Sequence, residues 1–353
     1  MYAIGIDIGK DSHTFAIYHR ETGEIVKDPS NFKNSKEGFK QLLDSFKKYP
    51  KKDVFIGMED TGHYHFTLLK FLLENKFKVG LINPRLTDLT RRAAGNTSKN
   101  DNLDSLTICD ILSSFERNKK YRITEIDKFD LYEQKYLTRH HHDLKEQINV
   151  YKNRLEKSVD IAFPEFNKLF KSKHGIVYMN ILKTFGSASS IASADIRTIR
   201  KCFEVTGKGN RISLTAAKLK EAAKESIGFS FPSDELQIKH LVEQIELIEK
   251  QIEEIDKKIE EFSVSNNSPI ISIPGISHFS GTSILAEYGD IHNFDSETKM
   301  ISFAGVAPYV YKSSQYEAAH LSITKKGSKY LRKTLYQIVL PVINNNSVFK
   351  KLL

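Results

Sequence analysis

Residues 2–15 read YAIGIDIGKDSHTF, and this stretch decides the fold of the amino-terminal part of the chain. Residues 3–8 form a short, mostly apolar run rich in β-branched side chains, which is typical of a strand buried on both faces. Asp7 interrupts the run. A buried carboxylate is costly unless a cation or hydrogen-bond donors compensate its charge. Asp7 is therefore expected to be either a metal ligand or a cap for the turn at Gly9.

The segments that follow alternate between strand and helix patterns. Ser35 has the position of a helix cap, and Pro84 ends the fifth expected strand. Three strands followed by alternating helices and strands is the order of an RNase H-like α/β domain. The later strands are expected at residues 14–19, 24–27, 53–58 and 78–82, and the first two helices after Ser35 and over residues 63–75.

Three more carboxylates stand where a shared site is expected. Glu59 follows the strand at residues 54–58, at the strand end where ligands collect in open α/β sheets. Asp101 and Asp104 open an amphipathic helix, and their i, i+3 spacing places both on one face. Acidic residues in a first helical turn are also ordinary partners of the helix dipole. Together with Asp7, however, these four hard oxygen ligands suit Mg²⁺ or Mn²⁺ and chemistry on a phosphodiester.

Composition limits the class of protein. The 353 residues carry 53 Lys and Arg against 44 Asp and Glu, a formal charge of +9, which fits either an acidic partner such as nucleic acid or a plain basic protein. Cys109 and Cys202 are isolated, so neither a zinc site nor a disulfide framework is expected. No apolar run approaches a membrane span and no signal peptide is recognisable, so we expect a cytosolic protein.

The middle of the chain reads as helical. A long charged helix is expected over residues 129–166, and it contains His140, His141 and His142. Three consecutive positions point in three directions, so a solvated or RNA-facing helix is expected rather than one metal site.

A coiled-coil seam follows. It consists of apolar residues four and three apart, and it is expected to pair with the 129–166 helix, to join protomers or to act as a spacer. Between the two helices, residues 207–211 form a basic turn that either contacts phosphate or is an ordinary loop. The seam residues are Leu241, Ile245, Ile248, Ile252, Ile255, Ile259 and Phe262.

The carboxy-terminal part contains three short motifs. Residues 273–277, IPGIS, precede an expected helix and resemble the turn of a helix-hairpin-helix, whose backbone N–H groups bind DNA phosphates. Residues 303–308 read FAGVAP and are followed by Ser313 and Ser314, which alone would indicate a polar turn. Residues 323–332 are basic and well placed to hold phosphates near the two serines.

These motifs together resemble the DEDD transposases of insertion sequences, a family that includes a pilin-gene invertase and bridge-RNA-guided recombinases. The resemblance rests on GIDIGK at residues 5–10, EDTGHY at 59–64, INP at 82–84, K-x-D-x-x-D at 99–104 and the carboxy-terminal motifs. It implies a RuvC-like domain over residues 1–125, a helical coiled-coil assembly region over 126–265 and a mostly helical transposase domain over 266–353.

The resemblance also implies roles for individual residues. Asp7, Glu59, Asp101 and Asp104 would bind Mg²⁺ or Mn²⁺, and Ser313 would be the nucleophile, with Ser314 in the place of the usual glycine. The chain would act on DNA as a homo-oligomer, a dimer or a tetramer, with a bridge RNA choosing the sites. The expected nucleic-acid contacts are Lys99, Lys325, Lys326, Lys329 and Arg332.

Three other classes share parts of this pattern. A RuvC-like hydrolytic nuclease would use the carboxylates without Ser313. An actin-like ATPase or sugar kinase opens with similar strands, but a second Gly-rich phosphate motif and a late glycine pair are not found. A non-catalytic nucleic-acid-binding scaffold would depend on the coiled coil instead.

Overall fold

The computed structural model describes residues 1–60, 62–95, 100–115, 123–126, 129–205, 213–308, 312–313, 316–317 and 322–351. The chain divides into two compact units, Met1–Glu133 and Gln134–Leu353, which are described separately below.

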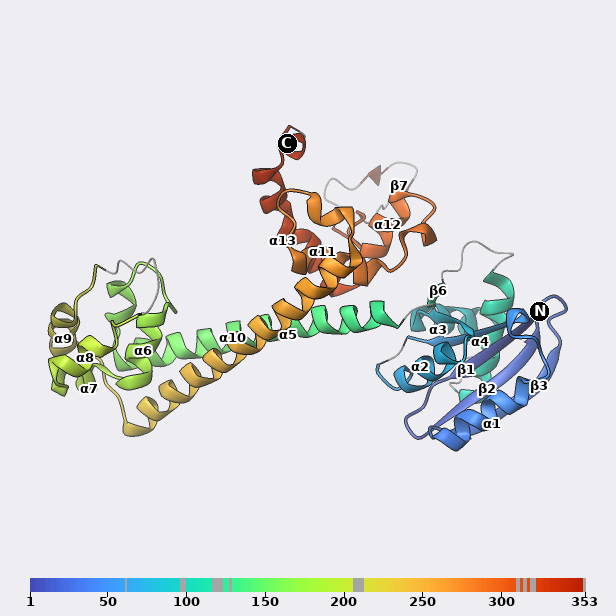
Figure 1. Ribbon diagram of the computed structural model, residues 1–353, viewed down its shortest axis with the longest axis horizontal. Coiled ribbons are helices and arrows are strands. Elements are labelled where there is room, and N and C mark those ends of the chain that lie inside the picture. Colours follow the sequence, from blue (N-terminus) through green and yellow to red (C-terminus); the bar gives the residue numbers. More distant parts are fainter. Residues whose placement is uncertain are drawn as a thin grey trace. The chain divides into compact units, whose positions relative to one another are not determined.

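Unit 1 is built on a six-stranded mixed sheet of order β3-β2-β1-β4-β5-β6 (Figure 1). β1, β4 and β5 run parallel to one another, and the other neighbours are antiparallel. This confirms the RNase H-like prediction, since β1 to β5 have the expected order. The strands are β1 (Tyr2–Asp7), β2 (Ser12–His19), β3 (Ile25–Lys33), β4 (Val54–Glu59), β5 (Lys78–Ile82) and β6 (Ile123–Ile126).

Helices cover both faces of this sheet. α1 (Lys36–Phe46) and α2 (Phe66–Glu74) pack on one face, where Ile4, Ile6 and the other even-numbered residues of β1 and β4 point. α3 (Pro84–Ala93) and α4 (Asp101–Phe115) cover the opposite face. Ser35 caps α1 as expected, because its side chain accepts a hydrogen bond from the Gly38 N–H.

Three elements of unit 1 differ from the expectation. Pro84 does more than end β5: it is the first residue of α3, and the Asn83 side chain caps that helix by accepting from the Arg85 N–H at 2.9 Å. β3 extends to Lys33, well beyond the four residues expected. β6 is a further strand that the sequence pattern did not predict.

Two long helices pair within unit 2. α5 (Asp130–Ala162) and α10 (Pro232–Asn266) share a seam that includes Leu144 and Ile148 of α5. Lys152 also donates to Glu249 across the pair at 3.0 Å. The seam predicted from α10 is therefore satisfied inside one chain, as an antiparallel hairpin. Its buried α10 residues are Ile248, Ile252, Ile255 and Ile259.

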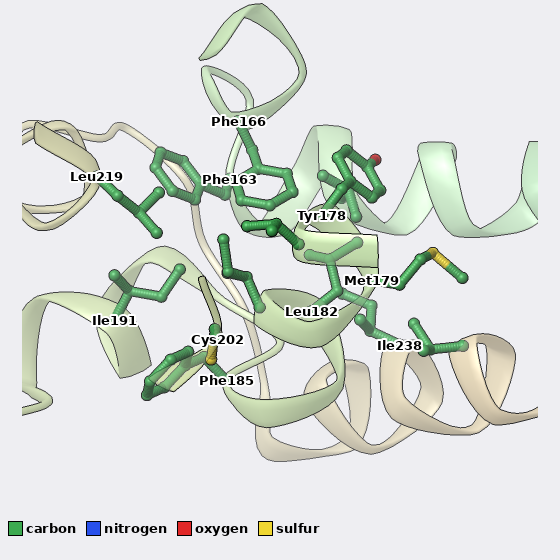
Figure 2. Packing of buried hydrophobic residues seen from close by; sticks show 14 of the residues in the cluster. Phe163, Phe166, Tyr178, Met179, Leu182, Phe185, Ile191, Cys202, Leu219 and Ile238 are labelled. Atoms are coloured by element: carbon green, nitrogen blue, oxygen red, sulfur yellow. The ribbon is translucent and has the colours of Figure 1, made fainter. Parts of the chain in front are cut away.

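Between α5 and α10, the described residues form four short helices. They are α6 (Ile176–Thr184), α7 (Ala188–Ser193), α8 (Ile196–Lys201) and α9 (Ala216–Lys224). Figure 2 shows their core, in which Phe163 and Phe166 pack near Tyr178 and Leu219, and Ile238 joins from α10. The basic turn at residues 207–211 lies outside the described residues.

The carboxy-terminal part of unit 2 is mostly helical, with α11 (His278–Tyr288), α12 (Glu297–Ala304), α13 (Lys329–Asn345) and α14 (Ser347–Lys350). A short hairpin, β7 (Lys312–Ser313) and β8 (Tyr316–Glu317), lies between α12 and α13. The IPGIS turn follows a 3₁₀ turn rather than a full helix. Its Gly275, at φ +99°, packs against the backbone of Pro341 in α13.

The prediction for the three histidines was wrong for two of them. His140 is exposed, but His141 and His142 are buried. The two rings are buried by helices that come later in the chain. Phe279 of α11 packs on both rings, and His142 Nε2 lies 2.9 Å from Thr334 Oγ1 of α13. None of the helices in the described ranges combines the length and apolar character needed to cross a membrane.

Candidate functional site

Asp7 and Glu59 end neighbouring parallel strands. The last residue pair between β1 and β4 joins Ile6 to Met58, so the next step of this register places Asp7 beside Glu59. Side chains alternate along a strand. Because Ile6 and Met58 point toward α1 and α2, the two carboxylates point to the opposite face, where α4 lies. Both are partly buried.

α4 lies unusually close to β1 and runs antiparallel to it. Gly5 makes this approach possible, since a Cβ there would lie 2.2 Å from the Ser105 carbonyl oxygen. The Gly5 N–H donates to Cys109 Sγ at 3.0 Å, and Cys109 Sγ in turn lies 3.6 Å from the Ala3 oxygen. The helix start is therefore at the carboxyl end of β1, next to Asp7.

This contact also explains the isolated Cys109. Burial raises the pKa of its thiol far above the usual range, so the group stays protonated and can donate to the Ala3 and Ala16 carbonyls. Cys109 is thus a packing residue between α4 and the sheet.

Asp101 and Asp104 lie in the first turn of α4 but in different surroundings. Asn100 starts the helix, because its Oδ1 accepts from the Asn102 N–H at 2.9 Å. Asp104 directly precedes the Gly5 contact at Ser105 and is buried, whereas Asp101 is exposed. Lys99, a predicted nucleic-acid contact, lies outside the described residues.

A basic residue that the sequence analysis missed also reaches this cluster. Arg91 of α3 lies with Nε 3.7 Å from Asp104 Oδ1, and its Nη2 contacts Asp88 Oδ1 at 2.7 Å. Both Arg91 and Asp104 are nearly buried, with side-chain exposures of 11% and 6%. The only hint in the sequence was the i, i+3 spacing of Asp88 and Arg91, which is common on helix surfaces.

The donor chemistry of this cluster fits a hard divalent cation. Asp7, Glu59, Asp101 and Asp104 supply only carboxylate oxygens, the ligands that Mg²⁺ and Mn²⁺ prefer. Within the described ranges, no three acidic, His or Cys side chains are already grouped closely enough to hold a metal ion. The strand register and the close packing of α4 nevertheless bring the carboxylates to the same edge of the sheet, and the Arg91 cation lies at Asp104.

The predicted nucleophile lies in unit 2. Ser313 ends β7 and pairs with Tyr316 in the β7–β8 hairpin, and Ser314 lies outside the described residues. A bridge between Pro308 and Ile323, with the Thr324 N–H donating to the Ala307 oxygen at 3.0 Å, joins the two segments that lead into and out of this hairpin. Ser313 is thus held on a hairpin between α12 and α13.

The predicted basic contacts of unit 2 surround the base of this hairpin. Lys325, Lys326 and Lys329 are exposed. Arg332 is only partly exposed, and its Nη1 donates to the Gly327 carbonyl oxygen at 2.5 Å. The same Nη1 donates to the Ala304 carbonyl oxygen of α12 at 3.4 Å, so Arg332 holds the 325–328 loop against α12, while the three lysines are accessible to a ligand.

Two family models match the chain. The model described as a transposase of the DEDD IS110 type matches residues 4–164, and that of the transposase IS116/IS110/IS902 family matches residues 267–353. Together they account for more than half of the chain. The DEDD match includes the strand ends and α4, and the second match includes the β7–β8 hairpin and α13.

Individual relatives are more distant. The transposase for insertion sequence element IS1111A of Coxiella burnetii is 36% identical over 64 residues, which is 18% of this chain and 17% of that one. The solved structure of T. thermophilus RuvC in complex with a Holliday junction substrate has 12% identity and a TM-score of 0.27, covering 36% of this chain and 99% of that chain. On its two family matches, the chain belongs to the IS110 family of insertion-sequence transposases.

Proposed function

We propose that this protein cuts and rejoins DNA strands, moving an insertion sequence by means of a carboxylate-bound divalent metal and a serine nucleophile. The observation that carries the proposal is the convergence of Asp7, Glu59 and the start of α4 at one edge of the sheet. Residues 1–125 would be the metal-binding domain, 126–265 the assembly region and 266–353 the domain of the nucleophile.

The four carboxylates would hold Mg²⁺ or Mn²⁺. When bound, such an ion favours ionisation of an attacking hydroxyl and stabilises negative charge on phosphate oxygens. Asp7, Glu59 and Asp104 are partly or fully buried, which restricts their side chains, whereas the side chain of Asp101 is exposed and accessible to a DNA strand. Arg91 offsets the charge of Asp104 until a cation or a phosphate is bound.

Ser313 would attack the phosphorus of a phosphodiester. One Ser Oγ–P bond forms, one P–O ester bond breaks, and the leaving DNA hydroxyl takes a proton. A hydroxyl of the partner strand then attacks the phosphoserine, and the serine leaves with its proton restored. The number of ester bonds is conserved, so strands are exchanged without an external energy source. Lys325, Lys326 and Lys329 would hold neighbouring phosphates.

The partners of this reaction are also part of the proposal. The protein would act as a homo-oligomer, a dimer or a tetramer, in which Ser313 of one chain works with the carboxylates of another. A bridge RNA from the element would choose the DNA sites. Lys99 would add a nucleic-acid contact beside Asp101.

The test is recombination between a cognate element and its target, with denaturing gels to detect protein attached to DNA. The proteins are wild type, Ser313→Ala, Ser314→Ala and Asp7→Asn, with Asp11→Asn as a control that removes a nearby exposed carboxylate. We expect Ser313→Ala to remove adduct and product, Asp7→Asn to abolish chemistry, and the other two to remain active.

Mixing experiments test the shared site. A mixture of inactive Asp7→Asn and Ser313→Ala chains is expected to regain part of the activity, because some mixed oligomers contain one intact site. Cleavage that persists without both serines but needs Asp7 would identify a hydrolytic RuvC-like nuclease and overturn the serine mechanism. Full activity of Asp7→Asn would overturn the metal site and leave a scaffold function.

A further inference from the structure

The positive charge of the chain is concentrated in the four-helix region between α5 and α10. Residues 165–233 contain 12 Lys and Arg against 5 Asp and Glu, which gives this region a formal charge of +7 out of +9 for the whole chain. The region lies between the two family matches, which end at residue 164 and resume at 267. Neither match accounts for this charge.

Exposed cations lie on one face of α8. Arg200 and Lys201 lie three and four residues after Arg197, so the three side chains share a face, and all three are exposed. Ile199 of the same helix is fully buried in the core of the region. The cationic face is therefore fixed in direction by the packing of α8.

These cations are not neutralised by neighbouring acids. Lys173 is paired with Glu156 and Lys183 with Glu246, but within the described residues Arg197, Arg200 and Lys201 form no ion pair. The nearby Asp195 serves as the cap of α8, where its Oδ1 accepts from the Arg197 N–H at 2.7 Å. The face therefore presents three full charges to a ligand.

α9 extends the basic surface. It packs against α7 and α8, and Lys220 Nζ donates to the Ala194 carbonyl oxygen at 2.6 Å, tying α9 to the turn before α8. Lys218 and Lys224 are exposed and, among the described residues, form no ion pair. Two more charges are thus held on a helix attached to α8.

We propose that the α8 face, formed by Arg197, Arg200 and Lys201, binds the phosphate backbone of a nucleic acid, with Lys218 and Lys224 of α9 strengthening the attraction. A row of fixed, unpaired cations matches the regular charges of such a backbone. Backbone contacts read no bases, so the binding is independent of sequence and positions the ligand for the rest of the protein.

The experiment compares the full-length wild type with a triple variant, Arg197→Gln, Arg200→Gln and Lys201→Gln. Fluorescence anisotropy measures binding to a duplex DNA of arbitrary sequence, and separately to an RNA hairpin, over a series of NaCl concentrations in EDTA. The control variant is Lys250→Gln, Lys257→Gln and Lys258→Gln on the exposed side of α10, which removes the same charge.

If three phosphates are contacted, the slope of log affinity against log salt falls by about 3 for DNA, and the affinity at low salt falls about 10–100-fold. The control is expected to stay within about twofold of wild type, since it loses charge but no phosphate contact. Loss on the DNA arm, the RNA arm or both supports the proposal and identifies the ligand.

Equal affinity and slope for the triple variant and wild type would overturn the proposal. An equal loss in the α10 control would also overturn it, because net charge alone would then explain the binding. If the triple variant unfolds, Lys218→Gln with Lys224→Gln serves instead, with an expected slope reduction of about 2. EDTA keeps the result independent of the metal site, so this inference and the proposed function can fail separately.

Discussion

The Arg91 guanidinium lies between two carboxylates, with Nη2 2.7 Å from Asp88 Oδ1 and Nε 3.7 Å from Asp104 Oδ1. Asp88 belongs to the same helix, whereas Asp104 belongs to α4 and to the proposed metal site. Arg91 therefore connects α3 to the acidic edge of the sheet and supplies positive charge where a metal ion would be bound.

Arg91→Gln is expected to bind Mn²⁺ about tenfold more tightly than wild type, because a unit charge a few ångströms from the ion is removed. The same change leaves Asp104 buried without this cation, so the metal-free variant is expected to lose about 2–3 kcal/mol of unfolding free energy. Calorimetric Mn²⁺ titration and urea unfolding with and without Mn²⁺ measure both effects.

Arg92→Gln is the matched control. Arg92 also pairs with Asp88, at 3.0 Å, but its side chain is 71% exposed and, among the described residues, it forms no ion pair with Asp104. We expect its Mn²⁺ affinity and stability to remain close to wild type. Unchanged or weaker Mn²⁺ binding by Arg91→Gln would show that the positive charge of Arg91 does not repel a metal ion bound at this site.

Gly5→Ala tests the approach of α4. The new Cβ would lie 2.2 Å from a backbone oxygen of α4, which cannot rotate away, so α4 and Asp104 must shift. We expect a loss of roughly 3 kcal/mol or more in unfolding free energy, together with weaker Mn²⁺ binding. Thermal unfolding and the Mn²⁺ titration measure the two effects.

Gly57→Ala is the comparison, since Gly57 is the partner of Gly5 in β4. Its Cβ would meet the Leu112 side chain at 2.8 Å, which can change rotamer, so the loss is expected to be about 1–2 kcal/mol. Equal effects of the two substitutions would contradict the close backbone contact at Gly5.

The positions of Asp7 and Glu59 could be predicted from the sequence because they depend on local patterns. The sequence predicted Asp7 within one short apolar strand and Glu59 at the end of another, whereas the parallel pairing of these two strands is seen only in the structure. The RNase H-like order follows from the same signals. The spacing of Asp101 and Asp104 likewise indicated one helix start.

The remaining features depend on tertiary contacts. Arg91 and Arg92 are equivalent in the sequence, and only packing of α3 against α4 buries one of them. His141 and His142 lie on a charged helix, but α11 and α13, more than 130 residues later in the chain, cover them. The coiled-coil seam predicted an apolar face and left open whether it pairs with the helix that is α5, joins protomers or acts as a spacer.

The buried histidines predict an acid-sensitive unit 2. Burial and the charge of nearby cations such as Lys333 lower the pKa of His142 to about 4, and burial lowers that of His141 to about 4 as well. Between about pH 6.5 and pH 4 the unfolded chain binds protons that the folded chain does not, so stability falls as the pH is lowered. Urea unfolding from pH 7.5 to pH 4.5 measures this loss.

The double variant His141→Gln and His142→Gln removes the two groups. Its unfolding free energy is expected to be lower than that of wild type at pH 7.5 but to fall less on acidification. Asp256 lies 3.2 Å from His141 Nε2, and burial raises its pKa. Its protonation therefore favours the folded chain as the pH falls and offsets part of the loss of stability caused by the histidines. An unchanged pH dependence would indicate that other groups control acid unfolding.

Because Arg139 and Glu287 form an ion pair in which only Glu287 is fully buried, removing Arg139 is expected to cost more unfolding free energy than removing the charge of Glu287. Arg139 Nε and Nη2 lie 2.6 and 3.1 Å from the Glu287 carboxylate, whose side chain is 1% exposed, while Arg139 is 37% exposed. Arg139→Met strands a buried charge and is expected to cost about 2–3 kcal/mol. Glu287→Gln leaves a cation that reaches solvent and is expected to cost about 1 kcal/mol.

The pH dependence separates this explanation from a simple loss of packing. Burial, the largest effect, raises the pKa of Glu287, but the hydrogen bond and charge of Arg139, the charge of Lys135 and the hydrogen bond from Ser328 together outweigh it and hold the pKa below the usual range. Without Arg139 the effect of burial is opposed only by Lys135 and Ser328, so the folded carboxyl of Arg139→Met takes up a proton more readily than that of the wild type. The cost of Arg139→Met should therefore shrink as the pH is lowered from 7.5 to 5, measured by urea unfolding against wild type. A cost that is constant over this range would mean that lost packing of the arginine side chain, and not the stranded charge, destabilises the variant.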